Sequence, residues 1–227
     1  MGQLTDVPLD ACFRFIVKQL KGISPGPERR HLYDWFEMTF WFFRRHNQPL
    51  TVLCLNTPVH FATDLLSDLQ QPETTGPVSI SRLEEMIMKQ VVLDYDRALW
   101  TITKHVRDIE KVSGFCVLVR CWDSCLVQKR SSTQPSFEEL HELARHTLHS
   151  TESLDVAINT ATHMIQQRSE DTMLYPSGME KQKHEANLRF WCQVLQNLRD
   201  RSRSTDQRLK NEIQLVDLFF VIRLFSS

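Results

Sequence analysis

Glycine is scarce in this chain, with only 6 among 227 residues. Few glycines leave few positions for tight turns or for loops that wrap a phosphate group, so the composition favours helices over an all-β fold. The sequence contains neither the glycine-rich loops that bind nucleotides nor the Gly-x-Ser-x-Gly turn of serine hydrolases. We find no catalytic constellation and predict that the chain is not an enzyme.

Long apolar runs are also missing, because none approaches the roughly 20 residues that span a bilayer. The chain carries 27 basic and 28 acidic residues, and this balance argues against a general binder of nucleic acid or of anionic membranes. The first residues lack the charged and apolar regions of a secretory signal. As written, the chain is therefore expected in the cytoplasm, with its 6 cysteines as free thiols.

Clusters of Gly, Pro, Ser and Thr divide the chain into blocks. We expect a short N-terminal segment at residues 1–30, in which residues 9–20 form a helix, and a main domain at residues 31–227. The clusters lie at residues 22–27, 71–77, 131–135 and 175–178.

The main domain opens on two stretches of strand-forming residues, at 35–43 and 50–55, with a turn between them. This pattern predicts a β-hairpin. A helix over residues 33–45 is the alternative, because aromatic residues on both faces do not settle the period. Pro58 then favours a short helix over residues 58–69, since proline is common in a first helical turn.

Three later stretches have apolar residues at helical spacing. In the first, Ser79 or Ser81 can cap the helix, Glu84 can complete a capping box with Ser81, and Gly114 ends or interrupts the helix. The second has Ser136 as its N-cap. The expected apolar stripes are Leu83, Ile87, Val91, Tyr95, Ala98, Ile102, Val106 and Ile109, then Phe137, Leu140, Ala144, Leu148, Thr151, Leu154, Ile158, Ala161 and Ile165.

The third and longest helix begins near residue 180, and its apolar residues form a heptad-like seam over residues 188–216. Two seam positions, Ser202 and Thr205, are polar. The apolar members of the seam are Leu188, Trp191, Leu195 and Leu198 before this gap, then Leu209 and Val216 after it. Leu195 and Leu198 should be buried against the preceding helix, whereas Leu209 and Val216 should be more exposed. The predicted fold class is mostly α (α+β), with three long helices packed against a small N-terminal β-hairpin or mixed segment.

Histidines and cysteines cluster in two places, but neither cluster has metal-site spacing. His141 and His146 are five residues apart, whereas the zincin helix needs two histidines four apart. His146 and His149 could share a metal, but no third ligand follows on their face, so we expect solvated histidines. Cys116, Cys121 and Cys125 lack a second cysteine pair and are expected to be buried thiols. We therefore predict no metal ligands.

Charged residues on the predicted helices are interpreted as solvated faces. Asp94 and Asp96 point to different sides of a helix and make a poor acid–base pair. The basic run at residues 199–204 is diluted by Asp200 and Asp206, so an exposed, ion-paired face is expected. No catalytic or cofactor-binding residue is predicted.

The order of elements gives a family resemblance. The strand LTVLCLNTP precedes three helical segments, MIMKQVVLDYDRALWTITKHVRDIEK, SFEELHELARHTLHSTESLDVAINTATHMI and LRFWCQVLQNLRDRSRSTDQRLKNEIQL. This order resembles the cytosolic half of CorA-like divalent-cation transporters. The last segment is most similar to the fungal branch of that superfamily, at Arg201-Ser202, at Arg208-Leu209 and at Asn-Glu-Ile-Gln-Leu of residues 211–215.

The resemblance implies a domain whose last helix runs as a stalk into two membrane helices, the first ending in Gly-Met-Asn, with magnesium or another divalent cation as the ion. Here Gly178-Met179 is followed by Glu180. We therefore expect a non-catalytic cytosolic regulatory domain, truncated before the membrane spans and not itself a transporter. The alternative is a free-standing helical interaction module that associates with itself or with a partner helix through the seam at residues 188–216.

Overall fold

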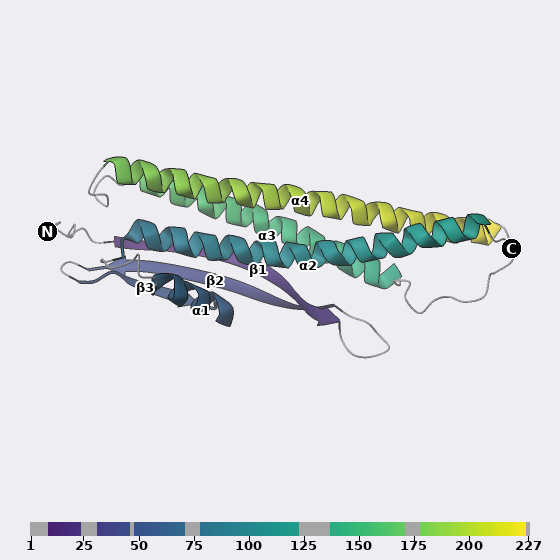
Figure 1. Cartoon of the computed structure of the whole chain (residues 1–227), viewed down its shortest axis with the longest axis horizontal. Coiled ribbons are helices and arrows are strands. Elements are labelled where there is room, and N and C mark those ends of the chain that lie inside the picture. Colours follow the sequence, from purple (N-terminus) through teal and green to yellow (C-terminus); the bar gives the residue numbers. More distant parts are fainter. Residues whose placement is uncertain are drawn as a thin grey trace.

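The computed structural model describes residues 9–23, 31–45, 48–70, 78–122, 137–170 and 178–225. Within them the chain forms a three-stranded sheet and four helices (Figure 1). The predicted fold class, mostly helical with a small β region near the N-terminus, is confirmed. In chain order the elements are β1 (Leu9–Ile23), β2 (His31–Arg44), β3 (Thr51–Leu55), α1 (Val59–Leu69), α2 (Ile80–Trp122), α3 (Phe137–Glu170) and α4 (Gly178–Phe225).

The sheet is antiparallel, with the strand order β1-β2-β3. Alternate residues of β1 are buried, whereas Asp10, Cys12 and Arg14 between them are exposed. The buried side chains of β1 and β2 therefore form one apolar face that packs on the helices. They are Leu9, Ala11, Phe13, Phe15 and Val17 of β1 and Met38, Phe40 and Phe42 of β2.

The predicted helix over residues 9–20 is wrong, because this segment lies within β1. Its apolar residues fit a period of two as well as a helical period, and the long antiparallel pairing with β2 decides between them. The predicted hairpin is confirmed: Phe43 pairs with Thr51 and Thr39 with Leu55. The alternative helix over residues 33–45 is therefore wrong. The short helix is confirmed as α1.

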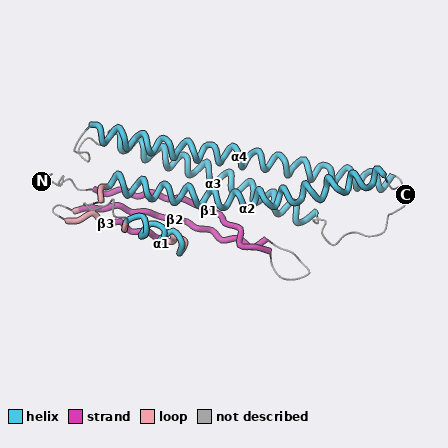
Figure 2. The backbone as a smooth tube through the Cα atoms, in the orientation of Figure 1, coloured by secondary structure: helices cyan, strands magenta, loops and turns pink. Residues whose placement is uncertain are grey.

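Helices α2 and α3 lie on one face of the sheet, and α4 packs over both of them on the side away from the sheet (Figure 2). Helix α1 lies next to β2 and β3 (Figure 2). Helices α2 and α4 run in the same direction and α3 runs in the opposite one (Figure 1). With 48 residues, α4 is about 70 Å long at 1.5 Å per residue. The last turns of α2 and α4 extend beyond the first turn of α3 (Figure 1).

Ser79 caps α2, since its Oγ accepts a hydrogen bond from the backbone N–H of Arg82 at 3.2 Å. The helix passes through Gly114 and continues to Trp122, so the expected end or interruption at this glycine is wrong. Ser136, the predicted cap of α3, lies outside the described residues.

The buried residues form two apolar clusters. The larger one joins the sheet, α1 and the adjoining parts of the three long helices. The smaller one lies further along and contains Ile102 and Val106 of α2, Leu140 and Leu143 of α3, and Leu209 of α4. The predicted stripe of α2 is buried or half-buried throughout.

The predicted stripe of α3 is correct in its second half but wrong at two positions. Phe137 and Leu148 are 46% and 50% exposed, although both were expected in the core. The buried face of α3 instead includes Leu143, Ala157 and Met164. A helix that lies between two helices and a sheet buries more than one stripe, which a single apolar line cannot describe.

Two small polar contacts separate the clusters along α4. Ser202 Oγ lies 2.8 Å from Thr151 Oγ1 of α3, and Thr205 Oγ1 lies 3.3 Å from Thr103 Oγ1 of α2. Both α4 residues are fully buried. The polar gap of the seam is therefore a hydrogen-bonded layer inside the bundle, which satisfies the buried hydroxyl groups.

The expectation that Leu209 is more exposed than Leu195 is wrong, because both side chains are fully buried. Ile102, Val106, Leu140 and Leu143 cover Leu209 because α2 and α3 extend alongside α4. Val216 is half-buried against the same cluster. In the part of the chain that the structure describes, no helix is both long and apolar enough to cross a membrane.

We predict that Leu195→Ala and Leu209→Ala lower the free energy of unfolding by similar amounts, about 2–5 kcal/mol each, because both remove a large side chain from a packed core. Leu215→Ala, at a 39% exposed position of the same helix, is the control and should cost less than about 1 kcal/mol. Denaturant unfolding measures all three. A Leu209→Ala cost as small as the control would show that this end of α4 is not packed.

Candidate functional site

The most deeply buried charges form an ion cluster that joins the three long helices. Arg168 near the end of α3 donates hydrogen bonds from Nε to Glu84 Oε1 at 2.9 Å and to Oε2 at 3.1 Å. A further bond from its Nη2 to Glu84 makes the pair bidentate. Both side chains are almost completely buried. A buried ion pair needs this geometry to offset the loss of hydration.

His184 of α4 completes the cluster. Its Nε2 lies 3.0 Å from Glu84 Oε2 and its Nδ1 lies 3.1 Å from Glu85 Oε1. Ionised carboxylates only accept hydrogen bonds, so an imidazole that bonds to one at each nitrogen must carry protons on both. Burial alone lowers the pKa of His184, but its hydrogen bonds to Glu84 and Glu85 outweigh burial and raise this pKa.

The role predicted for Glu84, the second half of a capping box with Ser81, is wrong. Its carboxylate points into the bundle and bonds to α3 and α4 instead of to the backbone at the start of α2. The local pattern Ser-x-x-Glu fits a capping box, and only the distant partners Arg168 and His184 reveal the actual role.

A second charged group ties α1 to α2. Asp94 of α2 is buried, and its Oδ1 lies 2.7 Å from His60 Nε2 and 3.0 Å from Arg97 Nη1. Burial raises the pKa of Asp94, although His60 and Arg97 favour the charged form. The prediction that Asp94 lies on a solvated helix face is therefore wrong. Asp96 is half-exposed, and its Oδ1 lies 3.5 Å from Arg201 Nη1.

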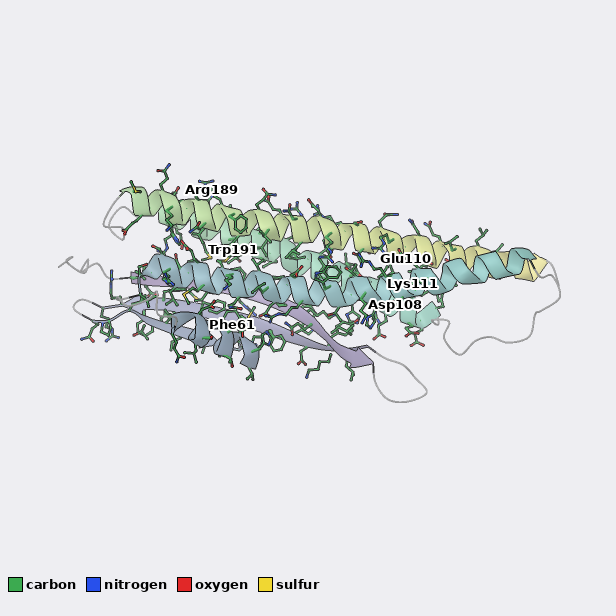
Figure 3. The ribbon with its side chains drawn as sticks, in the orientation of Figure 1. Phe61, Asp108, Glu110, Lys111, Arg189 and Trp191 are labelled. Atoms are coloured by element: carbon green, nitrogen blue, oxygen red, sulfur yellow. The ribbon has the colours of Figure 1, made fainter. Side chains whose placement is uncertain are left out.

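The basic run at residues 199–204 forms the ion-paired face that was predicted. Arg199 and Arg203 each contact Asp155 of α3, at 3.6 and 3.5 Å. The guanidinium of Arg201 also lies 3.9 Å from the centre of the Trp100 ring. Near the far end of the same helices, Arg208 forms a bidentate pair with Glu110, which Figure 3 labels. These contacts hold α4 against α2 and α3.

A third group surrounds Lys18 on β1. Its ammonium lies between the rings of Tyr33 and Trp35 of β2, 4.6 Å from each centroid. His146 Nδ1 is in hydrogen-bond contact with it, and His149 Nδ1 lies 3.1 Å away. The expectation that these two histidines are solvated is wrong, because α3 places both against the strands.

Burial, and then the charge of Arg145, lower the pKa of Lys18 to about 8, while Glu142 acts in the opposite direction. Burial also raises the pKa of Tyr33. No local sequence signal points to this group, because the strands and α3 lie far apart in the chain and the apolar spacing of the N-terminal residues also fits a helix.

Within the described ranges there is no group of three or more His, Cys, Asp or Glu side chains that could hold a metal ion. Cys116 and Cys121 lie in the last turns of α2, and Cys125 lies outside the described residues. Cys12 and Cys54 are exposed free thiols, and Cys192 is a buried one. A shallow groove of about 450 Å³ between β1 and α3 is lined by Arg14, Asn159 and His163, among others. The described side chains that line this groove do not form a catalytic arrangement.

Comparison with solved structures shows a likeness in fold. The chain is similar to the soluble domain of CorA from Methanocaldococcus jannaschii, with a TM-score of 0.56 and 12% sequence identity, over 92% of this chain and 72% of that one. No protein-family model matches the sequence, and no curated protein is significantly similar to it. At this identity the likeness concerns the fold alone, which is that of a CorA-like soluble domain.

We predict that the stabilising effect of His184 depends on pH. Because the folded-state pKa is raised, the stabilisation is complete below about pH 6.5, the ordinary value for histidine, and is lost as the pH rises through the raised pKa. His184→Gln should therefore lower the free energy of unfolding by about 3–5 kcal/mol at pH 6 and by clearly less at pH 9.

Chemical denaturation at both pH values measures this difference. The control is His163→Gln, at an exposed position of α3, which should change stability by no more than about 0.5 kcal/mol at either pH. An equal cost of His184→Gln at pH 6 and pH 9 would contradict a charged imidazole in the cluster.

Proposed function

We propose that this chain is the non-catalytic, cytosolic regulatory part of a CorA-like divalent-cation transporter. The observation that carries the proposal is the arrangement of the elements: a β-sheet, then three long helices, with α4 running past the body of the molecule (Figure 1). The likeness in fold to the soluble domain of CorA over 92% of the chain supports it. Magnesium is the proposed ion, and the fungal branch is the proposed subfamily.

The residues that carry the fungal resemblance support this assignment by their positions on α4. Ser202 belongs to the hydrogen-bonded layer with Thr151, Arg208 pairs with Glu110, and Leu209 is fully buried. These three members of the motif contact α2 or α3 and so describe how the last helix packs on the body. Such packing is what a regulatory domain needs if movements of its body are to reach a helix that leads to the membrane.

The far end of α4 is the proposed connection to membrane segments. Leu215, Leu218 and Val221, near the C-terminal end of α4, are all substantially exposed. The last turns of α4 extend beyond the start of α3 (Figure 1). In the proposed transporter, the helix continues from this end into the first of two membrane spans.

The same exposed residues favour a second candidate function, a helical interaction module. Most of the seam at residues 188–216 is already covered by α2 and α3. A partner helix or a second copy would therefore meet the exposed end, at Leu218 and Val221, instead of the seam as a whole. Apolar side chains gathered at one helix end are a common feature of helix-to-helix contacts.

We predict that genomic and transcript sequences downstream of the codon for Leu215 encode two apolar segments, the first ending in Gly-Met-Asn. Cells that lack magnesium uptake should regain growth when they express the chain joined to those segments at Leu215, but not when they express the chain as given. A control that carries Arg168→Met in the joined protein should grow less well, because the body is destabilised.

Absence of both apolar segments from the gene and its transcripts would contradict the transporter assignment. The interaction module would then be the better account, and sedimentation of the purified chain tests it. Leu218→Glu combined with Val221→Glu should abolish association, whereas Leu66→Glu, at an exposed position of α1, should leave it unchanged.

A further inference from the structure

We propose that Lys18, His146 and His149 form an acid-sensitive latch that holds the end of the β1–β2 hairpin against α3 and opens when the histidines are protonated. This inference rests on the geometry of the described residues and does not depend on the transporter assignment. The latch would let the domain respond to acidification by releasing one end of its sheet.

The first step of the argument is the position of Lys18. Its side chain is 4% exposed, and its ammonium is held between the rings of Tyr33 and Trp35. Aromatic faces attract a cation, but they do not accept the ammonium protons as a carboxylate would. The nitrogen acceptors that Lys18 has on α3 are the Nδ1 atoms of His146 and His149.

The second step concerns the protonation state of the two rings. An ammonium only donates hydrogen bonds, so each Nδ1 that faces Lys18 must be the unprotonated nitrogen of a neutral ring. A proton added at Nδ1 removes the acceptor. It also places a second positive charge next to the ammonium in a half-buried site, where like charges repel strongly. The closed contact and the protonated histidines therefore exclude each other.

The third step is the balance of the surrounding charges. Arg145 of α3 acts on Lys18 as a like charge, and Glu142 of α3 is the opposing one. Glu142 Oε1 also lies 3.9 Å from His146 Nε2, and Tyr33 on β2 is uncharged at neutral pH. The charged side chains that act on Lys18 are therefore one cation and one carboxylate, before any histidine is protonated.

The fourth step is that the contact can open without unfolding the domain. Lys18 pairs with Trp35 near the end of the hairpin, and the pairing register shifts just beyond it, between Leu20 and Gly22. On the other side, the Tyr95 hydroxyl of α2 donates a 2.8 Å hydrogen bond to the carbonyl of Ile16. That bond and the apolar layer beyond it anchor the rest of β1, so the opening is confined to the hairpin end.

Hydrogen exchange measured by mass spectrometry on the full chain tests the latch. After correction for intrinsic exchange rates, protection of peptides covering residues 16–23 and 140–150 should fall between pH 7.5 and pH 5.5. The expected fall is about tenfold if opening takes up one proton and about a hundredfold if it takes up two, since free histidine has a pKa of about 6.5. Protection near Leu195 should not change.

His146→Gln combined with His149→Gln keeps an oxygen acceptor for Lys18 but removes both titratable rings. This variant should show less than about a twofold change in protection over the same pH range. The matched control is His163→Gln, an exposed histidine of the same helix, which should retain the wild-type change. Lys18→Met keeps the apolar stem without the ammonium and should also abolish most of the change.

A wild-type chain whose protection is unchanged down to pH 5.5 would overturn the proposal. It would also be overturned if the change persisted in either the double histidine variant or Lys18→Met. The two variants alter opposite sides of the contact, so if one of them does not fold, as judged by circular dichroism at pH 7.5, the other still decides the matter.

Discussion

A guanidinium buried among three helices constrains this fold more than any other single group. Arg168 needs a carboxylate beside it, because an unpaired buried charge costs several kcal/mol. Glu84 of α2 supplies it, and His184 of α4 bonds to the other side of the same carboxylate. A shift of any helix by one turn, about 5.4 Å, would break these contacts. The cluster therefore fixes the positions of α2, α3 and α4 along their axes.

Much of the remaining packing follows from that alignment. With the starts of α2 and α4 held together, Thr103 meets Thr205 further along the bundle, and Glu110 meets Arg208 beyond it. The hydroxyl layer between the two apolar clusters accepts only one register without leaving a buried polar group unsatisfied. Apolar contacts supply most of the stability in such a bundle, whereas these polar contacts select one alignment among many.

The sequence predicted the elements whose signals are local. The apolar stripe of α2, the start of α4 near residue 180 and the hairpin between β2 and β3 all follow from spacing and from turn residues. The prediction of a helix is wrong for β1, because the apolar residues of LDACFRFIVKQL fit both a helical period and a period of two. Only pairing with β2 selects the strand. The predictions for Glu84 and Leu209 are also wrong, because the partners of both residues lie on other helices. Periodicity shows that a residue is on an apolar or polar face but does not identify what covers that face.

The charged groups near the sheet illustrate the same limit. His146 and His149 were considered as a pair because of their spacing on one helix, but their common neighbour is a lysine from a strand more than a hundred residues earlier. Asp94 was assigned to a solvated helix face because it and Asp96 point to different sides of a helix, whereas α1 buries it with His60. Interactions that distinguish this domain from any other helical bundle therefore lie between segments that are distant in sequence.

A double-mutant cycle on Glu84 and Arg168 tests the central claim most directly. Glu84→Gln and Arg168→Met should each lower the free energy of unfolding by about 3–5 kcal/mol at pH 7, because each leaves an unbalanced buried group. The double variant should be more stable than the sum of the two losses implies, by about 2 kcal/mol or more, since neither charge then remains. Losses that add to within about 0.5 kcal/mol would contradict the account, because independent sites behave in that way.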